Sequence, residues 1–191
     1  MSTQRGTAPP IHELDELKAR VNRHIEMSTD SLSSVALVNI DINDMSPWYD
    51  VFGPTQRDYA LEAVFNTISD VKLDYHDRLQ YLGRHPYDKF MLMDTGNIET
   101  LEQLAKKLKS SIDGTTIPNP GNLPQTEHQW KGATVQLDPT HLTVRMGVAY
   151  QRSGSGQYNV EGLFSKVLEA TESAKATPSQ VMVVEFNPAI R

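Results

Sequence analysis

The chain of 191 residues contains no cysteine. This absence excludes disulfide bonds, catalysis by a thiolate and zinc sites built on cysteine. No apolar run approaches the roughly 20 residues that a membrane-spanning helix needs, so an integral membrane protein is not expected. Residues 1–10 are polar and lack the apolar core of a signal sequence. These absences favour a cytoplasmic protein.

Positive charge is also scarce. The sequence has 18 lysines and arginines against 24 aspartates and glutamates, and its formal net charge is −6. A nucleic-acid surface usually needs a basic stripe, and an anionic membrane attracts basic segments, so the composition argues against both as partners. The six histidines show no metal-ligand spacing. Neither a Ser/His/Asp arrangement nor a phosphate loop of the Gly-x-x-x-x-Gly-Lys type is present.

What remains is an ordinary globular composition, with 38% hydrophobic and 22% charged residues. The length fits one domain, which we expect to span residues 11–191 after a disordered lead at 1–10. The spacing of apolar residues predicts helices and strands along the whole of this domain. The helices are expected at 11–27, from 55 onward, at 98–112 and at 160–174. The strands are expected at 35–41, 78–83, 89–94, 142–150 and 181–186, with a short additional strand within 130–137.

Cap and turn residues complete this prediction. Asn97 and Asn159 are expected to cap the two later helices, and Thr55 is expected to form a capping box with Asp58. Residues 113–129 are rich in Gly, Pro, Asn and Thr, which predicts a long loop. Helices that alternate with strands in this order predict an α/β or α+β fold, with a central mixed or antiparallel sheet of about five strands flanked by helices.

Five segments resemble, in order and spacing, the signatures of the GGDEF nucleotidyl cyclases. They lie at residues 15–24, 41–46, 49–58, 142–149 and 170–175. The first shares Asp15, Leu17, Asn22 and Arg23 with the family's Asp-x-Leu-Thr-Gly-Leu-x-Asn-Arg-Arg. The resemblance covers residues 15–186 and implies the nucleotidyl-cyclase or polymerase-palm-like fold of that family.

An active member of the family joins two nucleoside triphosphates, one held by each half of a dimer, and needs two divalent metal ions. The resemblance implies that Asp41 and Asp88 are metal ligands, together with the backbone carbonyl of Ile42. It also implies that Mg²⁺ is the cofactor if nucleotide binding is retained. From the residues alone, aspartates at strand ends can equally well cap neighbouring turns.

The turn that names the family is altered, because residues 86–90 read Pro-Tyr-Asp-Lys-Phe. In the family, paired glycines let the backbone pass close to the nucleotide. Pro86 and Tyr87 stand in their place; an alternative alignment takes Gly83 as the first glycine, and it also breaks the pair. Lys89 replaces the second acid, which reverses a charge beside the metal pair. We expect its ammonium group to pair with one of the two aspartates.

The nucleotide-binding positions are only partly retained. Asp58 matches the acid that reads the Watson–Crick edge of guanine, although the capping box is a sufficient structural role for it. Tyr49 replaces the partner asparagine and could stack on a base or fill the pocket. Ser46 and Ser179 replace two phosphate-binding cations, whereas Lys175 is kept. The candidate nucleotide-binding residues are Ser46, Tyr49, Asp58, Tyr87, Lys89 and Lys175.

The sequence therefore predicts a degenerate GGDEF domain without cyclase activity, which acts as a regulatory, dimerising or nucleotide-sensing module in bacterial cyclic di-GMP signalling. GTP or another nucleotide, and a protein partner or a second copy of the chain, are the expected partners. The family's product-inhibition motif, Arg-x-x-Asp before the turn, is absent. Two alternatives stay open. One is an active, divergent, metal-dependent nucleotidyl cyclase that uses Asp41 and Asp88; the other is a pure protein-interaction domain that uses the loop at 113–129.

Overall fold

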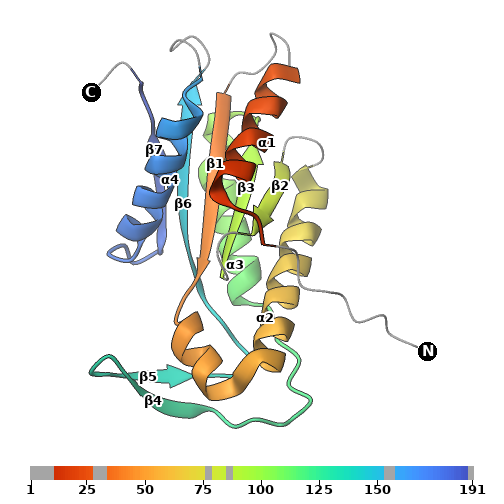
Figure 1. The fold of residues 1–191 in the computed structure, drawn as a ribbon, viewed down its shortest axis with the longest axis vertical. Helices are drawn as coiled ribbons and strands as arrows, with labels where there is room; N and C mark the ends of the chain where they lie inside the picture. The colour runs from red at the N-terminus through yellow and green to blue at the C-terminus, as the bar shows by residue number, and fades with distance from the viewer. Residues whose placement is uncertain (1–10, 28–33, 76–78, 85–87, 153–157, 189–191) are drawn as a thin grey trace, which may run out of the picture.

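A five-stranded sheet in the order β2-β3-β1-β6-β7 forms the centre of the molecule (Figure 1). It comes from a computed structural model that describes residues 11–27, 34–75, 79–84, 88–152 and 158–188, so the lead expected at 1–10 lies outside the described residues. The central strand pairs antiparallel with both neighbours, whereas β6 and β7 run parallel. The sheet is therefore mixed, as predicted. The strands are β1 (Ser34–Ile42), β2 (Leu79–Arg84), β3 (Lys89–Asp94), β6 (Val144–Arg152) and β7 (Val181–Glu185).

Helices cover both faces of this sheet. The helices are α1 (Leu14–Met27), α2 (Met45–Tyr75), α3 (Leu101–Asp113), which follows the 3-10 turn η2 (Ile98–Thr100), and α4 (Val160–Ala174). α1 and α4 pack on one face, and α2 and α3 pack on the other. Val38 and Ile40 of β1 join the core under α2 and α3, whereas Leu37 joins the core under α1 and α4. Because both faces of β1 are buried, its sequence is a continuous apolar run rather than an alternating one.

The close approach of α4 to the sheet depends on Gly147 in β6. A Cβ atom at this position would lie 2.5 Å from the carbonyl oxygen of Val167 and would collide with the backbone of Thr171. A buried polar pair fixes the same contact, because Asn39 Nδ2 donates to Thr171 Oγ1 at 2.9 Å. Asn39 and Asp41 are two residues apart on β1, so both side chains stand on the face that α4 covers.

One predicted helix start is wrong, and another is displaced by one residue. α1 begins at Leu14 rather than at residue 11, because Ile11 forms a parallel bridge with the end of β2. The helix expected from Thr55 is part of α2, in which Gly53 has a non-helical conformation with φ 77° and ψ −179°. Pro54 follows, at a position where its missing N–H costs nothing. The second helical segment of α2 therefore begins at Pro54, one residue before the predicted start. Gly53, not Thr55, precedes this segment, so the predicted capping box is wrong.

The caps of the two later helices are confirmed. The Asn97 side chain accepts a hydrogen bond from the N–H of Glu99 at 3.1 Å, at the start of η2. The Asn159 side chain accepts from the N–H of Gly162 at 2.9 Å, in the first turn of α4. No helix in the described part of the chain is long and apolar enough to cross a bilayer.

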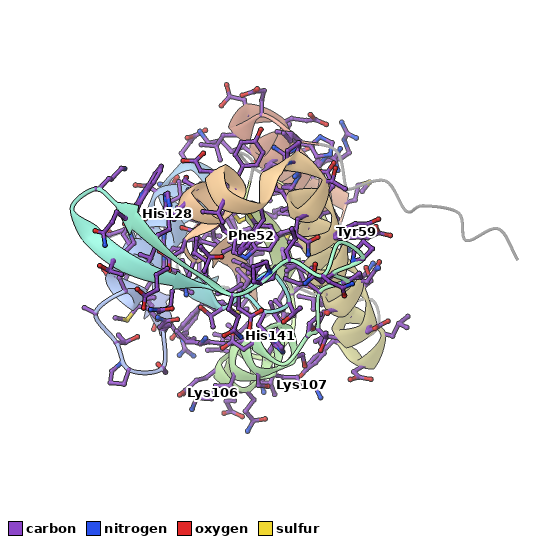
Figure 2. All side chains as sticks on the ribbon, turned by 90° about the horizontal axis from the view of Figure 1, so that it is seen from below. Phe52, Tyr59, Lys106, Lys107, His128 and His141 are labelled. Atoms are coloured by element: carbon purple, nitrogen blue, oxygen red, sulfur yellow. The ribbon has the colours of Figure 1, made fainter. Side chains whose placement is uncertain are left out.

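The loop predicted at 113–129 is shorter than expected. Its last residues form β4 (Thr126–Trp130), which pairs antiparallel with β5 (Ala133–Leu137) in a separate two-stranded sheet. The additional strand expected within 130–137 is thus half of a hairpin. Figures 1 and 2 show this hairpin, which carries His128, projecting from the body that the larger sheet and its helices form.

The segments on either side of the hairpin are fastened to α2. The side-chain amide of Gln56 donates to the carbonyl oxygens of Pro118 and Pro139, each at 2.8 Å. Trp48 Nε1 donates to the carbonyl oxygen of Asp138 at 2.9 Å. Gln56 and Trp48 are both buried, so these bonds hold irregular backbone against the helix.

Candidate functional site

Asp41 lies near the end of β1 between two cations that the neighbouring strands supply. Its cross-strand partners are Lys89 in β3 and Arg145 in β6, so the three side chains stand on one face of the sheet. Arg145 Nη2 donates to Asp41 Oδ2 at 2.5 Å, and Lys89 Nζ lies 3.9 Å from the same oxygen. The Asp41 side chain is only 2% exposed. The expected pairing of Lys89 with an aspartate is confirmed, and Arg145 is a second, closer partner.

The rest of this site comes from α4 and from the turn before β3. Glu172 in α4 accepts a hydrogen bond from Lys175 Nζ at 2.5 Å, and its charge acts on Asp41. The carbonyl oxygen of Asp88 accepts from the N–H of Ile42 at 3.2 Å, which places the two strand ends side by side. We refer to six residues as the strand-end cluster: Asp41, Asp88, Lys89, Arg145, Glu172 and Lys175. With all six groups ionised, the three acids and three bases of this cluster balance each other.

Burial dominates the protonation of the two aspartates in this cluster. It raises the pKa of Asp41 above the usual range of an aspartate, and the charges of Lys89 and Arg145 oppose this rise only in part. Burial also raises the pKa of Asp88, and the negative charge of Asp41 adds to that rise. The two carboxylates are therefore close enough to repel each other, and the cations that favour their ionised forms come from the protein itself.

The contacts of the strand-end cluster do not fit a magnesium site. Mg²⁺ demands a near-ideal octahedron of oxygen ligands, whereas Asp41 Oδ2 already accepts from Arg145 and faces Lys89. Both cations would repel a divalent ion that approached this oxygen. Within the described residues, no group of three or more histidines, aspartates or glutamates could hold a metal ion. The contacts give no support to the expected ligation by Asp41, Ile42 and Asp88.

An arginine links the two residues that were expected to read a base. The guanidinium of Arg57 lies over the ring of Tyr49, with Cζ 5.0 Å from the ring centroid. Its Nε and Nη2 also donate to Asp58 Oδ1, at 3.3 and 3.1 Å. Tyr49 is 39% exposed, so it does not fill a closed pocket. One oxygen of the carboxylate that was expected to recognise guanine is therefore engaged by Arg57.

Three of the remaining candidates, Ser46, Tyr49 and Asp58, are not bonded to the strand-end cluster by a hydrogen bond or ion pair within the described residues. Ser46 is exposed in the first turn of α2. Tyr87 lies outside the described residues. Gly83, the glycine of the alternative alignment, lies within β2, where packing explains it, because a Cβ atom would come within 2.6 Å of the ring of His12.

The sequence patterns predicted no role in the site for Arg145, Arg57 or Glu172. A signal for Arg145 was available, because the segment 142–149 resembles the GGDEF signature Val-Thr-x-Ser-x-Gly-Val-Ala, in which serine stands at the position of Arg145. The register that puts Arg145 opposite Asp41 is a tertiary feature, and no local pattern reports it. Arg57 and Glu172 stand on helix surfaces, where a charged residue is unremarkable.

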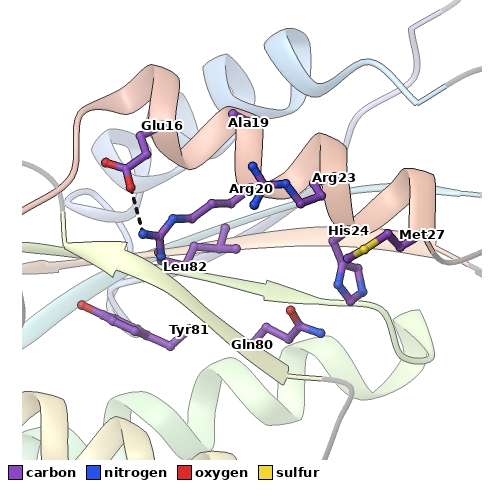
Figure 3. A pocket seen from close by; sticks show the side chains of 9 residues that line it. All are labelled: Glu16, Ala19, Arg20, Arg23, His24, Met27, Gln80, Tyr81 and Leu82. Atoms are coloured by element: carbon purple, nitrogen blue, oxygen red, sulfur yellow. Dashed lines mark hydrogen bonds and ion pairs between the residues drawn. The ribbon is translucent and has the colours of Figure 1, made fainter.

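A hollow of about 420 Å³ lies elsewhere, between α1 and β2. Figure 3 shows Arg20 at its centre, bonded to Glu16, with Tyr81 and Leu82 below. β2 is the edge strand and is separated from β1 by β3, whose register sets Leu79 and Tyr81 level with Ala36 and Val38, so the hollow lies away from Asp41. Arg20 Nη1 donates to the carbonyl oxygen of Leu82 at 2.8 Å, so it satisfies backbone at the edge of the sheet.

No protein-family model matches the chain, and no curated protein matches its sequence. Solved structures match its fold. The GGDEF domain of DgcB from Caulobacter crescentus, in complex with c-di-GMP, is 11% identical with a TM-score of 0.69, over 95% of this chain and 98% of that one. The active GGEEF domain of a diguanylate cyclase from Vibrio cholerae is 16% identical with a TM-score of 0.61, over 88% and 92%.

A longer match is the diguanylate cyclase SiaD from Pseudomonas aeruginosa, in complex with its activator SiaC. It is 16% identical with a TM-score of 0.66 over 89% of this chain, and the chain spans 56% of SiaD. At such low identity these matches establish the fold alone. The molecule has the fold of GGDEF domains, as the motif resemblance predicted.

Proposed function

We propose that this chain, with its GGDEF-type fold, is a degenerate member of the diguanylate cyclase family that has lost cyclase activity. It acts in the cytoplasm as a regulatory or dimerising module in cyclic di-GMP signalling. The observation that supports the loss of activity is Lys89, whose ammonium group lies 3.9 Å from Asp41. By resemblance, this is the position of the second catalytic acid.

The charge of the strand-end cluster explains why Lys89 matters. Joining two triphosphates requires divalent ions that neutralise the phosphates and the attacking oxygen. A pair of acids attracts such ions, whereas a carboxylate flanked by Lys89 and Arg145 has its counter-charge already. Without bound metal, the chemistry that the resemblance implies has no Lewis acid.

Base recognition is impaired independently. The guanine-reading acid, Asp58, is engaged by Arg57, which also covers Tyr49. A nucleotide that used Asp58 would have to compete with this arginine for the carboxylate. With Arg57 moved aside, the exposed ring of Tyr49 could stack on a base, and the half-exposed Lys175 could contact a phosphate. The nucleotide-sensing form of the proposal therefore has GTP or another nucleotide binding weakly and without turnover.

Protein contact is the second half of the proposal. SiaD is solved with an activator protein, and for this chain we propose a protein partner or a second copy as the molecule that it regulates. The projecting β4–β5 hairpin favours the alternative of a pure interaction domain, because a two-stranded ribbon outside the main sheet has free edges to offer.

Incubation with each nucleoside triphosphate, together with Mg²⁺ or Mn²⁺, tests the proposal. We expect no cyclic dinucleotide and no pyrophosphate. Turnover that disappears in Asp41→Ala but persists in Asp50→Ala, an exposed acid on α2, would overturn it. Calorimetry under the same conditions separates the two forms of the proposal. Binding without turnover supports nucleotide sensing, and no binding supports regulation through protein contact.

A further inference from the structure

The guanidinium of Arg145 is bound through both of its terminal nitrogens, whereas its buried Nε has no hydrogen-bond partner among the described residues. Its Nη2 donates to Asp41 at 2.5 Å and its Nη1 donates to Asn43 Oδ1 at 3.1 Å. Asn43 is itself fixed, because its side-chain amide donates to Thr143 Oγ1 and to Gln180 Oε1, at 2.9 and 3.0 Å. The guanidinium is therefore bound on two sides by groups that are themselves held.

Asp41 needs such a partner. Its side chain is 2% exposed, and an ionised carboxylate removed from water is stable only when it is paired and hydrogen-bonded. Lys89 contributes charge at 3.9 Å but lies beyond hydrogen-bond distance. Arg145 supplies the hydrogen bond, and its own side chain is only 17% exposed.

We infer that the Arg145 guanidinium has taken the place of a divalent metal ion, so that the protein provides a permanent internal counter-ion to Asp41. This inference deepens the proposed function, on which it rests. A metal ion could bind Asp41 only by displacing a guanidinium held at both ends and by approaching Lys89 as well. The structural integrity of the site is therefore independent of metal.

Removing the Arg145 side chain should make the stability of the protein depend on metal. Arg145→Ser installs the residue that the resembling signature has and leaves Asp41 buried without its hydrogen-bond donor. This variant should melt several degrees below the wild type. A divalent ion can now occupy the vacated position beside Asp41 and Asp88, so Mn²⁺ or Mg²⁺ should restore part of the lost melting temperature by binding the folded state alone.

Thermal unfolding in EDTA and in about 10 mM MnCl₂, at equal ionic strength, provides the measurement. The wild type should melt at the same temperature in both buffers, whereas Arg145→Ser should be stabilised by Mn²⁺. Arg145→Lys keeps a cation and should not respond. Arg152→Ser is the matched control, because it breaks the exposed pair with Glu185, 3.0 Å apart, and should not respond either.

Two results would overturn the inference. One is an Arg145→Ser protein that folds, melts lower and gains nothing from Mn²⁺, which would make Arg145 a simple ion-pair partner. The other is stoichiometric Mn²⁺ binding by the wild type, measured by electron paramagnetic resonance and lost in Asp41→Asn. The second measurement decides the matter even if Arg145→Ser does not fold. Neither result depends on turnover, so a wild type that binds metal but makes no cyclic dinucleotide would refute this inference and leave the proposed function standing.

Discussion

Tyr81 carries a buried hydroxyl group that has no hydrogen-bond partner among the described residues. Its ring packs edge-on against Phe65, with centroids 5.1 Å apart, and tilted against Phe90. Tyr81→Phe keeps these contacts and removes an unpaired polar atom, so it should raise the free energy of unfolding by about 1 kcal/mol in urea titrations. Tyr150→Phe is the control, because its exposed hydroxyl contacts Glu185, and it should change stability by less than about 0.5 kcal/mol.

The same hydroxyl makes stability depend on pH at the alkaline end. Burial raises the pKa of Tyr81 to about 12, from a value of about 10 in the unfolded chain. The folded state holds the phenolic proton more tightly, so its contribution is complete below pH 10 and is lost as the pH rises toward 12. The stability advantage of Tyr81→Phe over the wild type should therefore widen across this interval in urea titrations. Parallel pH profiles for the two proteins would contradict the assignment.

Two glycines, Gly147 beside α4 and Gly162 within it, should differ in how much a Cβ atom destabilises the fold. Gly147→Ala would force a Cβ atom against the backbone of Val167 and Thr171, which cannot move without shifting the helix. Gly162→Ala would press on the ring of Phe186, which is half-buried near the end of the described chain and can swing aside. We expect losses of about 3 kcal/mol and about 1 kcal/mol in the free energy of unfolding, measured by chemical denaturation. Equal losses would mean that α4 adjusts as easily as a side chain does.

At the scale of elements, the sequence predicted what is local. The strand expected at 89–94 has those bounds, and the strand expected at 35–41 is one residue longer at each end. The kink at Gly53 escaped prediction, because a positive φ leaves no periodic trace in the neighbouring residues. β4 escaped because its residues are polar and its pairing with β5, not burial, makes it a strand.

In the candidate site, too, the residues at strand ends were predicted from local sequence, whereas their tertiary partners were not. The two aspartates and Lys89 were predicted because each stands at a strand end in a recognisable order. The partners that set their charge, Arg145 and Glu172, come from β6 and α4 and meet Asp41 only when the sheet and helix assemble. Local sequence fixes which side chains a strand presents, but it does not determine what faces them.

Gln56 of α2 holds the irregular segments on both sides of the hairpin against the helix. Its amide group donates to two backbone carbonyls that are more than 20 residues apart, at Pro118 and Pro139. Gln56→Leu leaves both carbonyls unpaired and should cost about 2 kcal/mol in free energy of unfolding. Hydrogen exchange should accelerate at residues 114–143 while β1 keeps its protection. Gln136→Leu, on the exposed hairpin, is the control and should leave this exchange unchanged.

At the scale of the whole molecule, the five-stranded sheet and its helices form a stable body, and the β4–β5 hairpin is attached to it. The five-stranded sheet and its helices hold nearly all of both hydrophobic cores, to which the hairpin strands add the buried Leu137 and the half-buried Val135. Most hairpin side chains contact each other or solvent; the His128 and Trp130 rings, for example, lie 6.1 Å apart. The hairpin should therefore be dispensable for folding, which leaves it free to serve as a contact surface.

Replacing residues 127–136 by Gly-Ser-Gly tests this division, because it removes the hairpin and keeps Leu137. The shortened protein should unfold in one cooperative transition, within a few degrees of the wild type, since little apolar surface has been lost. Leu137→Asp is the contrasting variant, because it places a charge in the hydrophobic core under α2 and α3. It should lower the melting temperature far more than the deletion does, although the hairpin stays intact. If the shortened protein loses cooperative unfolding, the hairpin belongs to the body, and an interaction role for it would have to be compatible with a structural one.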